Sequence, residues 1–266
     1  KRHGWFDAKV EKMKFGIFDK DIWHLYLDVR ILRGLVKHLD KKSVRRIRII
    51  QALNQCVNAF AEDRKNSDKA RECLRIELDK VASASDLKVS AIGHAHIDTG
   101  WLWPVRETVR KTARTFATQL KIIDEYPQYI FGASQPQHYQ FMKDSYPEIY
   151  ERVKLAVSKG NWECQGGMWV EADCNLISGE SMVRQLLHGK NFFKDEFDVV
   201  VDNLWLPDVF GYSAALPQIL KKSGIDFFLT QKLSWSQFNE FPHQTFHWRG
   251  IDGTEILTHF PPENTY

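Results

Sequence analysis

Two histidines and an aspartate alternate in the segment His94-Ala-His96-Ile-Asp98. Alternate residues of an extended chain point to the same side, so these three side chains can lie side by side on one face. Imidazole and carboxylate groups together suit a metal such as zinc or cobalt. The alternative is structural, because buried and hydrogen-bonded polar residues occur in ordinary protein cores. The position of the segment after an apolar stretch, and before Gly100 and Trp101, favours the metal site.

A further carboxylate, Asp208, also follows an apolar stretch and stands directly after Pro207. Three roles are open to a carboxylate at such a place: metal ligand, nucleophile or helix N-cap. The next helical pattern begins near Ser213, several residues further on, which weakens the N-cap interpretation. The residues alone leave the other two roles open.

The segments that precede these residues alternate between two patterns. Five short apolar segments are predicted to be strands: 87–93, 129–134, 161–166, 203–207 and 226–230. Helical patterns stand between and after them: 105–123, 137–159, 179–197 and 214–223. Such alternation with short connections predicts βα units and a parallel sheet or barrel. Two further strands, 245–250 and 255–260, are expected to form a hairpin closed by an Asp-Gly turn.

Chemistry in parallel βα folds lies at the carboxyl ends of the strands. The five segments that follow the predicted strands should therefore meet at one rim. These segments are 94–104, 134–137, 166–173, 208–213 and 231–235. Together they would supply imidazole, carboxylate, ammonium and indole groups to one site.

The first part of the chain has a different pattern. Apolar residues recur every three or four positions over 22–39 and 44–60, and a third helix is expected over about 68–82. The polar stretch 83–86 is the expected boundary. We therefore expect a helical lead-in segment over residues 1–86 and a separate α/β domain over residues 87–266.

Composition narrows the possible classes. With 266 residues, 43% hydrophobic and 27% charged, the chain is composed like a globular protein rather than a disordered or fibrous one. No apolar run reaches about 18 residues, so we expect no membrane partner. Residues 1–86 carry 20 basic and 13 acidic residues, but on helices with apolar faces, which favours a solvated surface over nucleic-acid binding. Four cysteines without a CxxC pair predict reduced thiols and a cytoplasmic protein.

Four segments in order resemble the N-terminal catalytic region of glycoside hydrolase family 38, the retaining α-mannosidases, and are closest to its cytosolic-type branch. The segments are HAHIDTGWLWP (94–104), QGGMWVEAD (165–173), WLPDVFGYSAALPQI (205–219) and LTQKLSW (229–235). The resemblance covers roughly residues 87–266. It implies a parallel seven-stranded β/α barrel-like catalytic domain, incomplete here, with one divalent metal ion, Zn²⁺ or Co²⁺.

The resemblance also implies roles for particular residues. His96 and Asp98 match two metal ligands, and Asp208 matches a residue that is both metal ligand and nucleophile. By the same matching, His94 is a positioning residue behind the ligands. Substrate contacts are implied for four further residues: Trp101, Phe210, Lys232 and Tyr266. Lys232 stands where other branches of the family carry arginine.

The implied reaction is hydrolysis of terminal non-reducing α-D-mannose from mannosides or oligomannose glycans, through a covalent glycosyl intermediate on Asp208. The family's acid/base aspartate and a fourth ligand, a histidine, belong to later segments that we do not find before Tyr266. We therefore expect this chain to be a fragment of a longer enzyme. The sequence leaves open whether that enzyme is a homo-oligomer.

Two other functions are compatible with the same residues. A metal-dependent amidohydrolase or polysaccharide deacetylase would use a metal-activated water without a covalent sugar intermediate. A non-catalytic carbohydrate-binding protein could keep the fold without the acid/base group. The segment around Asp208 and the position of Trp101 argue against a deacetylase or amidohydrolase.

Overall fold

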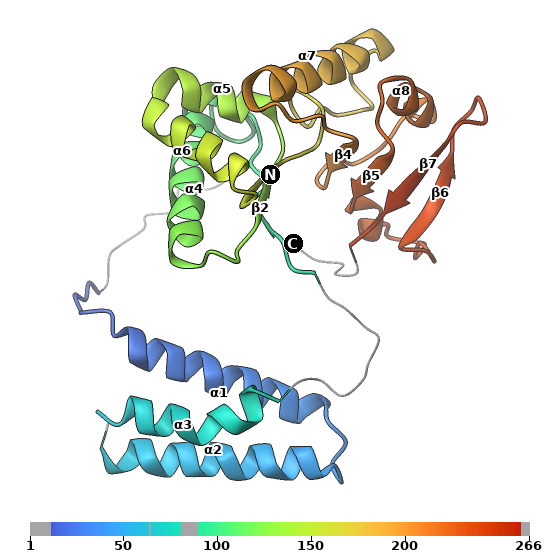
Figure 1. The fold of residues 1–266 in the computed structure, drawn as a ribbon. Helices are drawn as coiled ribbons and strands as arrows, with labels where there is room; N and C mark the ends of the chain where they lie inside the picture. The colour runs from blue at the N-terminus through green and yellow to red at the C-terminus, as the bar shows by residue number, and fades with distance from the viewer. Residues whose placement is uncertain (1–11, 64, 81–89, 262–266) are drawn as a thin grey trace. The chain divides into compact units, whose positions relative to one another are not determined.

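The computed structural model describes residues 12–63, 65–80 and 90–261 (Figure 1). The chain divides into two compact units, residues 1–88 and 89–266, each with its own core. The boundary expected at residue 86 and the start of the strand expected at residue 87 lie outside the described residues.

The described residues of the first unit form three helices: α1 (Lys20–His38), α2 (Val44–Glu62) and α3 (Ser67–Leu78). Asp19 caps α1 by accepting hydrogen bonds from two backbone N–H groups of its first turn, and Ser43 caps α2 by accepting one, from Arg46 N–H. The helices pack against one another around apolar side chains at helical spacing, such as Leu32, Ile49 and Leu74. The three predicted helices are therefore confirmed, with α3 ending at Leu78.

The second unit is an α/β structure with two sheets. The first sheet has the order β1-β2-β3 and is parallel throughout, with β1 (Gly93–His94), β2 (Phe131–Ala133) and β3 (Trp162–Cys164). The second sheet has the order β4-β5-β7-β6, with β4 (Asn203–Leu206), β5 (Phe227–Thr230), β6 (Thr245–Arg249) and β7 (Glu255–His259). In it β4, β5 and β7 are parallel, and β6 is antiparallel to β7.

The predicted parallel α/β fold is confirmed, and so is the hairpin formed by β6 and β7. The seven described strands do not show the expected parallel seven-stranded barrel, because they form two sheets and one strand runs antiparallel. The physical reason for that strand's direction is the short connection between β6 and β7. In this connection Gly250 N–H donates to Thr254 O at 2.8 Å, and Gly253 takes a φ of +84°.

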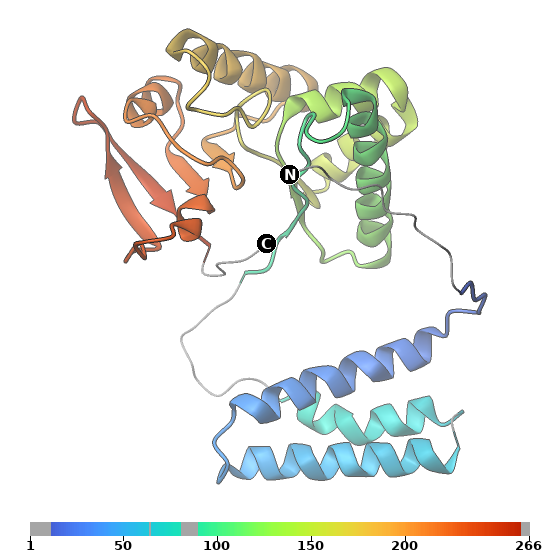
Figure 2. The same ribbon diagram turned by 180° about the vertical axis from the view of Figure 1, so that it is seen from behind.

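Helices surround the two sheets. Figure 1 shows α4 (Val105–Glu125), α5 (Pro136–Ser145) and α6 (Pro147–Ser158) gathered beside the first sheet. α7 (Gly179–Phe197) packs in the cores of both sheets, with Phe193 in the first and Leu186 in the second, and α8 (Leu216–Lys222) lies beside the second sheet (Figure 2). None of the helices in the described ranges is both long and apolar enough to cross a membrane.

The helix expected over 137–159 is in fact two helices, α5 and α6. Between them Tyr146 has φ −142° and ψ 62°, outside the helical region. Pro147 explains the break, because a proline disfavours helical geometry in the residue before it and has no N–H to continue the helix. By contrast, α7 spans the predicted residues 179–197, with Ser178 as its N-cap.

Each sheet packs on its own apolar core. Aromatic rings fill the first one, where Phe116 and Phe131 contact the Trp162 ring edge-on. Trp162 Nε1 donates to Tyr139 Oη at 2.9 Å, and that hydroxyl donates to Ala133 O at 2.9 Å, so the buried polar atoms are satisfied. Mainly aliphatic residues fill the core of the second sheet: Leu186, Leu204, Leu206, Leu216, Leu220 and Ile225.

Candidate active site

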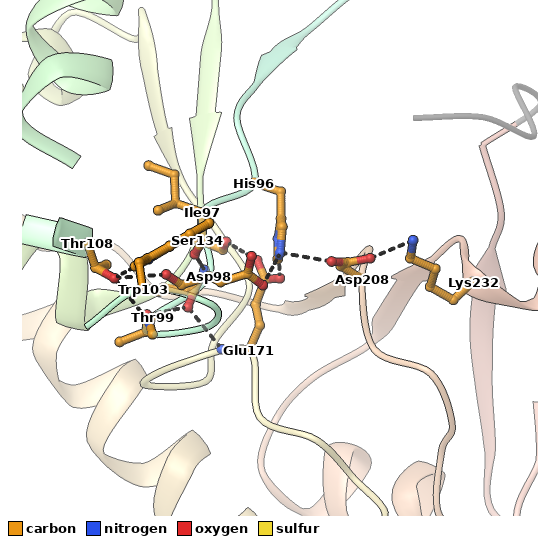
Figure 3. Close-up of polar contacts among 12 residues, drawn as sticks. His96, Ile97, Asp98, Thr99, Trp103, Thr108, Ser134, Glu171, Asp208 and Lys232 are labelled. Carbon is orange, nitrogen blue, oxygen red and sulfur yellow. Dashed lines mark hydrogen bonds and ion pairs between the residues drawn. The ribbon is translucent and has the colours of Figure 1, made fainter. Parts of the chain in front are cut away.

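Three predicted site residues lie together where the two sheets meet (Figure 3). His96 and Asp98 follow β1 of the first sheet, and Asp208 follows β4 of the second. His96 Nε2 lies 3.2 Å from Asp98 Oδ1 and 3.3 Å from Asp208 Oδ2. The structure thus brings Asp208, which follows a strand of the second sheet, into contact with His96, which follows a strand of the first.

The geometry of this group fits a single metal ion. One nitrogen and two oxygen ligand atoms lie within 4.8 Å of one another. Ligands about 2.0–2.2 Å from a tetrahedral zinc ion are separated by about 3.3–3.6 Å, by simple trigonometry. The distances of His96 Nε2 from the two carboxylates, 3.2 and 3.3 Å, are close to that separation. The ligand types suit zinc or cobalt equally.

Thr108, a buried residue of α4, holds the loop that carries Asp98. Its hydroxyl donates to Asp98 O at 3.1 Å and accepts from Gly100 N–H at 3.1 Å and Trp103 Nε1 at 3.0 Å. Gly100 has a φ of +87°, a conformation that favours glycine. The sharp turn leaves the Trp101 ring 65% exposed, edge-on against Trp103.

Glu171, in the loop after β3, contacts the other side of His96. Its Oε2 lies 2.8 Å from His96 Nδ1, and its Oε1 accepts a hydrogen bond from Ser134 Oγ at 2.5 Å. Burial opposes the charged imidazole, but the carboxylates of Glu171 and Asp98 outweigh it and raise the pKa of His96 to about 9. Sequence reasoning did not select Glu171, although it lies in the rim segment 166–173.

Lys232 contacts the second oxygen of Asp208. Its Nζ lies 2.6 Å from Asp208 Oδ1, and its side chain is buried. The ammonium group also lies over the Trp235 ring, 3.2 Å from the centroid. Phe210 stacks on Trp235 with ring centroids 6.0 Å apart, and both rings are largely exposed. An aromatic surface thus lies next to the carboxylate.

Asp208 is not the N-cap of the helix that follows it. α8 begins at Leu216, and its N-cap position is Ala215. The segment between them is held by Tyr212, whose hydroxyl donates to Val209 O at 2.8 Å and contacts Thr230. The carboxylate of Asp208 therefore contacts His96 and Lys232 and does not cap a helix.

Residues 86–266 match the family described as "Glycosyl hydrolases family 38 N-terminal domain". The chain belongs to this family. Three curated relatives match over 93–97% of the chain: Alpha-mannosidase G of Dictyostelium discoideum at 44% identity, Alpha-mannosidase 2C1 of Homo sapiens at 42% and Alpha-mannosidase of Saccharomyces cerevisiae at 41%. The chain spans about a quarter of the length of each, since it covers 24–25% of them.

Among solved structures, an α-mannosidase from Enterococcus faecalis shares the fold with a TM-score of 0.54 at 23% identity. The match covers 64% of this chain and 19% of that one. Membership of family 38 agrees with the resemblance in the four sequence segments. It does not favour the amidohydrolase, deacetylase or non-catalytic alternatives.

The remaining residues suggested by the family 38 resemblance lie in different surroundings. His94 packs its ring against Trp205, with centroids 4.9 Å apart, and burial together with the neighbouring His96 lowers its pKa to about 4. A neutral, packed imidazole is compatible with a positioning role. The substrate contacts expected of Trp101, Phe210 and Lys232 stay predictions, and Tyr266 lies outside the described residues.

Proposed function

We propose that the whole protein is a retaining α-mannosidase that releases terminal α-D-mannose from mannosides or oligomannose glycans. The observation that carries this proposal is the meeting of His96, Asp98 and Asp208 in a chain of family 38. The relatives named α-mannosidases, at 41–44% identity over most of the chain, support it.

In this proposal His96, Asp98 and Asp208 hold one divalent ion, Zn²⁺ or Co²⁺. When bound, the ion would supply positive charge that binds neighbouring hydroxyls of the sugar and stabilises charge in the transition state. The two oxygens of Asp208 lie in different surroundings that match its double role: Oδ2 faces His96, and Oδ1 faces Lys232.

Asp208 is proposed to attack the anomeric carbon. A bond forms between a carboxylate oxygen and that carbon, while the bond from the carbon to the leaving oxygen breaks and that oxygen takes a proton from the acid/base aspartate. Water, deprotonated by the same aspartate, then hydrolyses the glycosyl ester and restores Asp208. The ammonium group of buried Lys232 lies 2.6 Å from Asp208 Oδ1 and keeps the carboxylate in one orientation. The exposed rings of Trp101 and Phe210 offer apolar faces to the sugar C–H groups.

Several finer points complete the proposal. The relatives are about four times as long as this chain. We therefore assign the acid/base aspartate and a fourth ligand histidine to the rest of the protein, which would also complete a barrel-like catalytic domain from residue 87 onward. Residues 1–86 are proposed to be a helical lead-in segment. A mannose-containing oligosaccharide is the proposed partner.

A cytoplasmic location is part of the same proposal. All four cysteines are unbridged. Burial raises the pKa of Cys164 to about 12 and that of Cys174 to about 11, so these thiols stay protonated. Reduced, protonated thiols suit a reducing compartment. Mass mapping of the native protein under alkylation would test it, since any disulfide among the four would contradict the location.

A fluorinated mannosyl fluoride that forms a slowly hydrolysed glycosyl-enzyme would test the reaction directly. The whole protein should gain the mass of one sugar, and peptide mapping should find it on Asp208. Asp208→Asn should gain none. Asp202→Asn, which changes an exposed carboxylate before β4, is the matched control and should be labelled like the wild type. Mannoside hydrolysis without any adduct on Asp208 would instead support a metal-activated water.

A further inference from the structure

His96 offers two ring nitrogens, and each has its own carboxylate surroundings. Nε2 faces Asp98 and Asp208, while Nδ1 lies 2.8 Å from Glu171 Oε2 (Figure 3). A neutral imidazole has one N–H and one lone pair. Which nitrogen binds a metal ion therefore depends on what holds the proton on the other.

We propose that Glu171 is a positioning residue of the metal site, which accepts the Nδ1–H of His96 and thereby presents the lone pair of Nε2 to the ion. The inference rests on the metal site of the proposed function and extends it to a residue outside the ligand set. Carboxylates that accept the distal N–H of a ligand histidine fix its tautomer and ring orientation and make it more basic.

The surroundings of Glu171 support such a role, because its carboxylate is held from two sides. Its side chain is 5% exposed, so the charge is nearly removed from water. One oxygen contacts His96 and the other accepts the hydrogen bond from Ser134. A buried carboxylate is costly unless it is paired and hydrogen-bonded. The carboxylate of Glu171 has an ionic partner, His96, and a hydrogen-bond partner, Ser134, and both lie in loops of the candidate site.

Gln135, the residue after Ser134, ties the backbone of Glu171 to the ligand loop. Its Oε1 accepts from Glu171 N–H at 3.3 Å and from Thr99 Oγ1 at 2.9 Å, and its Nε2 donates to Ile97 O at 3.0 Å. Ile97 stands between the two ligands His96 and Asp98. One buried amide therefore fixes the distance between the loop that carries Glu171 and the loop that carries the ligands.

The backbone of Gln135 shows that this arrangement is maintained at a cost. Its φ is +64° and its ψ 83°, a left-handed conformation that is unfavourable for a residue other than glycine. Such conformations persist where the surrounding structure holds them, commonly at functional sites. Here the side-chain bonds to Ile97 and Glu171 keep the residue in place. The pair Ser134 and Gln135 thus holds both the side chain and the backbone of Glu171.

Glu171→Gln tests this assignment, because it keeps the size of the side chain and removes its charge. If the amide turns its NH₂ towards His96 Nδ1, the proton moves to Nε2 and blocks the lone pair. If it turns its oxygen there, it accepts more weakly than a carboxylate. Titration of the metal-free whole protein with Co²⁺ against a competing chelator should show affinity weakened by about 10–100-fold.

Matched variants separate positioning from mere support of the fold. Glu163→Gln makes the same change at an exposed carboxylate on β3 and should leave Co²⁺ affinity within about twofold. Ser134→Ala removes one hydrogen bond but keeps the carboxylate, so its loss should be smaller, about 5–10-fold. The metal-free melting temperature of Glu171→Gln should fall by some degrees, because the amide no longer pairs with the His96 imidazolium. The titration is therefore run at a temperature at which circular dichroism shows the metal-free variant to be fully folded.

Three results would overturn the inference. The first is Co²⁺ affinity within threefold of wild type in Glu171→Gln. The second is a metal-free Glu171→Gln protein that is already partly unfolded at the temperature of the titration, so that unfolding accounts for the weaker binding. The third is a change in the visible Co²⁺ absorption bands at saturation, which would make Glu171 a ligand itself. If the wild-type protein binds no Co²⁺, the proposed metal site fails as well, and that result is seen before any variant is made.

Discussion

The two sheets contribute to the candidate site in different ways. On the first-sheet side, His96 and Asp98 stand in a loop fastened by buried hydrogen bonds from Thr108 and Gln135. On the second-sheet side, Asp208 is oriented mainly by the ammonium group of Lys232. Exposed aromatic rings lie on both sides, Phe210 and Trp235 on the second and Trp101 on the first, but the buried Thr108 and Gln135 that anchor a loop by hydrogen bonds lie on the first.

This difference separates two tasks. Buried, satisfied hydrogen bonds rigidify a loop, because breaking one leaves a desolvated polar group without a partner. Such rigidity suits residues that must hold a metal ion at fixed distances. Exposed rings next to a single carboxylate suit contact with a sugar, which must enter and leave. We therefore propose that the first-sheet side mainly fixes ligand geometry, and that the substrate contacts the second-sheet side together with Trp101.

The largest loss of turnover is expected at Asp208, and comparison with His96 separates the roles of the two sides. We expect Asp208→Asn to lower turnover of an aryl α-mannoside by roughly 10⁴-fold or more, because it removes the nucleophile together with a ligand. His96→Ala should lose metal but keep the nucleophile, so excess Co²⁺ should restore part of its turnover. Elemental analysis and kcat measured together check both. If excess Co²⁺ restored turnover equally in Asp208→Asn and His96→Ala, Asp208 would not have a role beyond that of a metal ligand.

Gly189→Ala should damage the first-sheet side through packing. A Cβ at this position of α7 would lie 2.2 Å from Gly167 O, in the loop that leads to Glu171. We expect the free energy of unfolding to fall by about 1–3 kcal/mol, as in other overpacked sites. Gly179→Ala in the same helix is the control, because nothing lies within 4 Å of its Cβ. Denaturant unfolding curves measure both, and equal midpoints would contradict the prediction.

Thr108→Val should loosen the Asp98 loop without touching the ion. The hydroxyl makes three hydrogen bonds, to Asp98, Gly100 and Trp103, and valine makes none. We expect a loss of about 1–2 kcal/mol in stability and a several-fold weaker Co²⁺ affinity. Thr118→Val, at an exposed position of α4, should change neither. Unaltered Co²⁺ binding in Thr108→Val would show that the loop does not need this anchor.

Phe210→Ala should give the smallest of these effects. It should change substrate binding on the second-sheet side and leave metal binding unchanged. Removing the ring takes away one face of the aromatic surface over Lys232. We expect KM for a mannoside to rise by about 3–10-fold, equivalent to roughly 0.5–1.5 kcal/mol of aromatic contact. Metal content should stay at the wild-type level. A loss of bound metal in this variant would mean that the two sides do not divide the tasks.

Sequence reasoning predicted the parts of the site that depend on local order. The order of strands and loops predicted that the segments carrying His96, Asp98 and Asp208 share one rim, and the resemblance to family 38 implied that these three residues form the ligand set. Parallel strands place their carboxyl ends on one rim, so the topology brings distant segments together without any contact being known. The helix over 179–197 was equally accessible, because its pattern and its cap are local.

What the sequence did not predict depends on contacts between distant side chains. Ser134 and Glu171 are 37 residues apart, and no local pattern shows that one hydroxyl reaches that carboxylate. The left-handed backbone of Gln135 is likewise imposed by its surroundings. The break at Tyr146 is a different case, because Pro147 is visible in the sequence and was outweighed by the helical pattern around it.

The position of the ligands on two sheets makes a bound ion a cross-link. His96 and Asp98 belong to one sheet and Asp208 to the other, so an ion held by all three joins two separately packed cores. Ligand binding to the folded state stabilises it by about 2.7 kcal/mol when the free ligand is at one hundred times its Kd. Metal supply would therefore govern how long the folded protein survives as well as how fast it works. Metal-free protein should therefore melt at a lower temperature than metal-loaded protein and should be cleaved sooner by proteases.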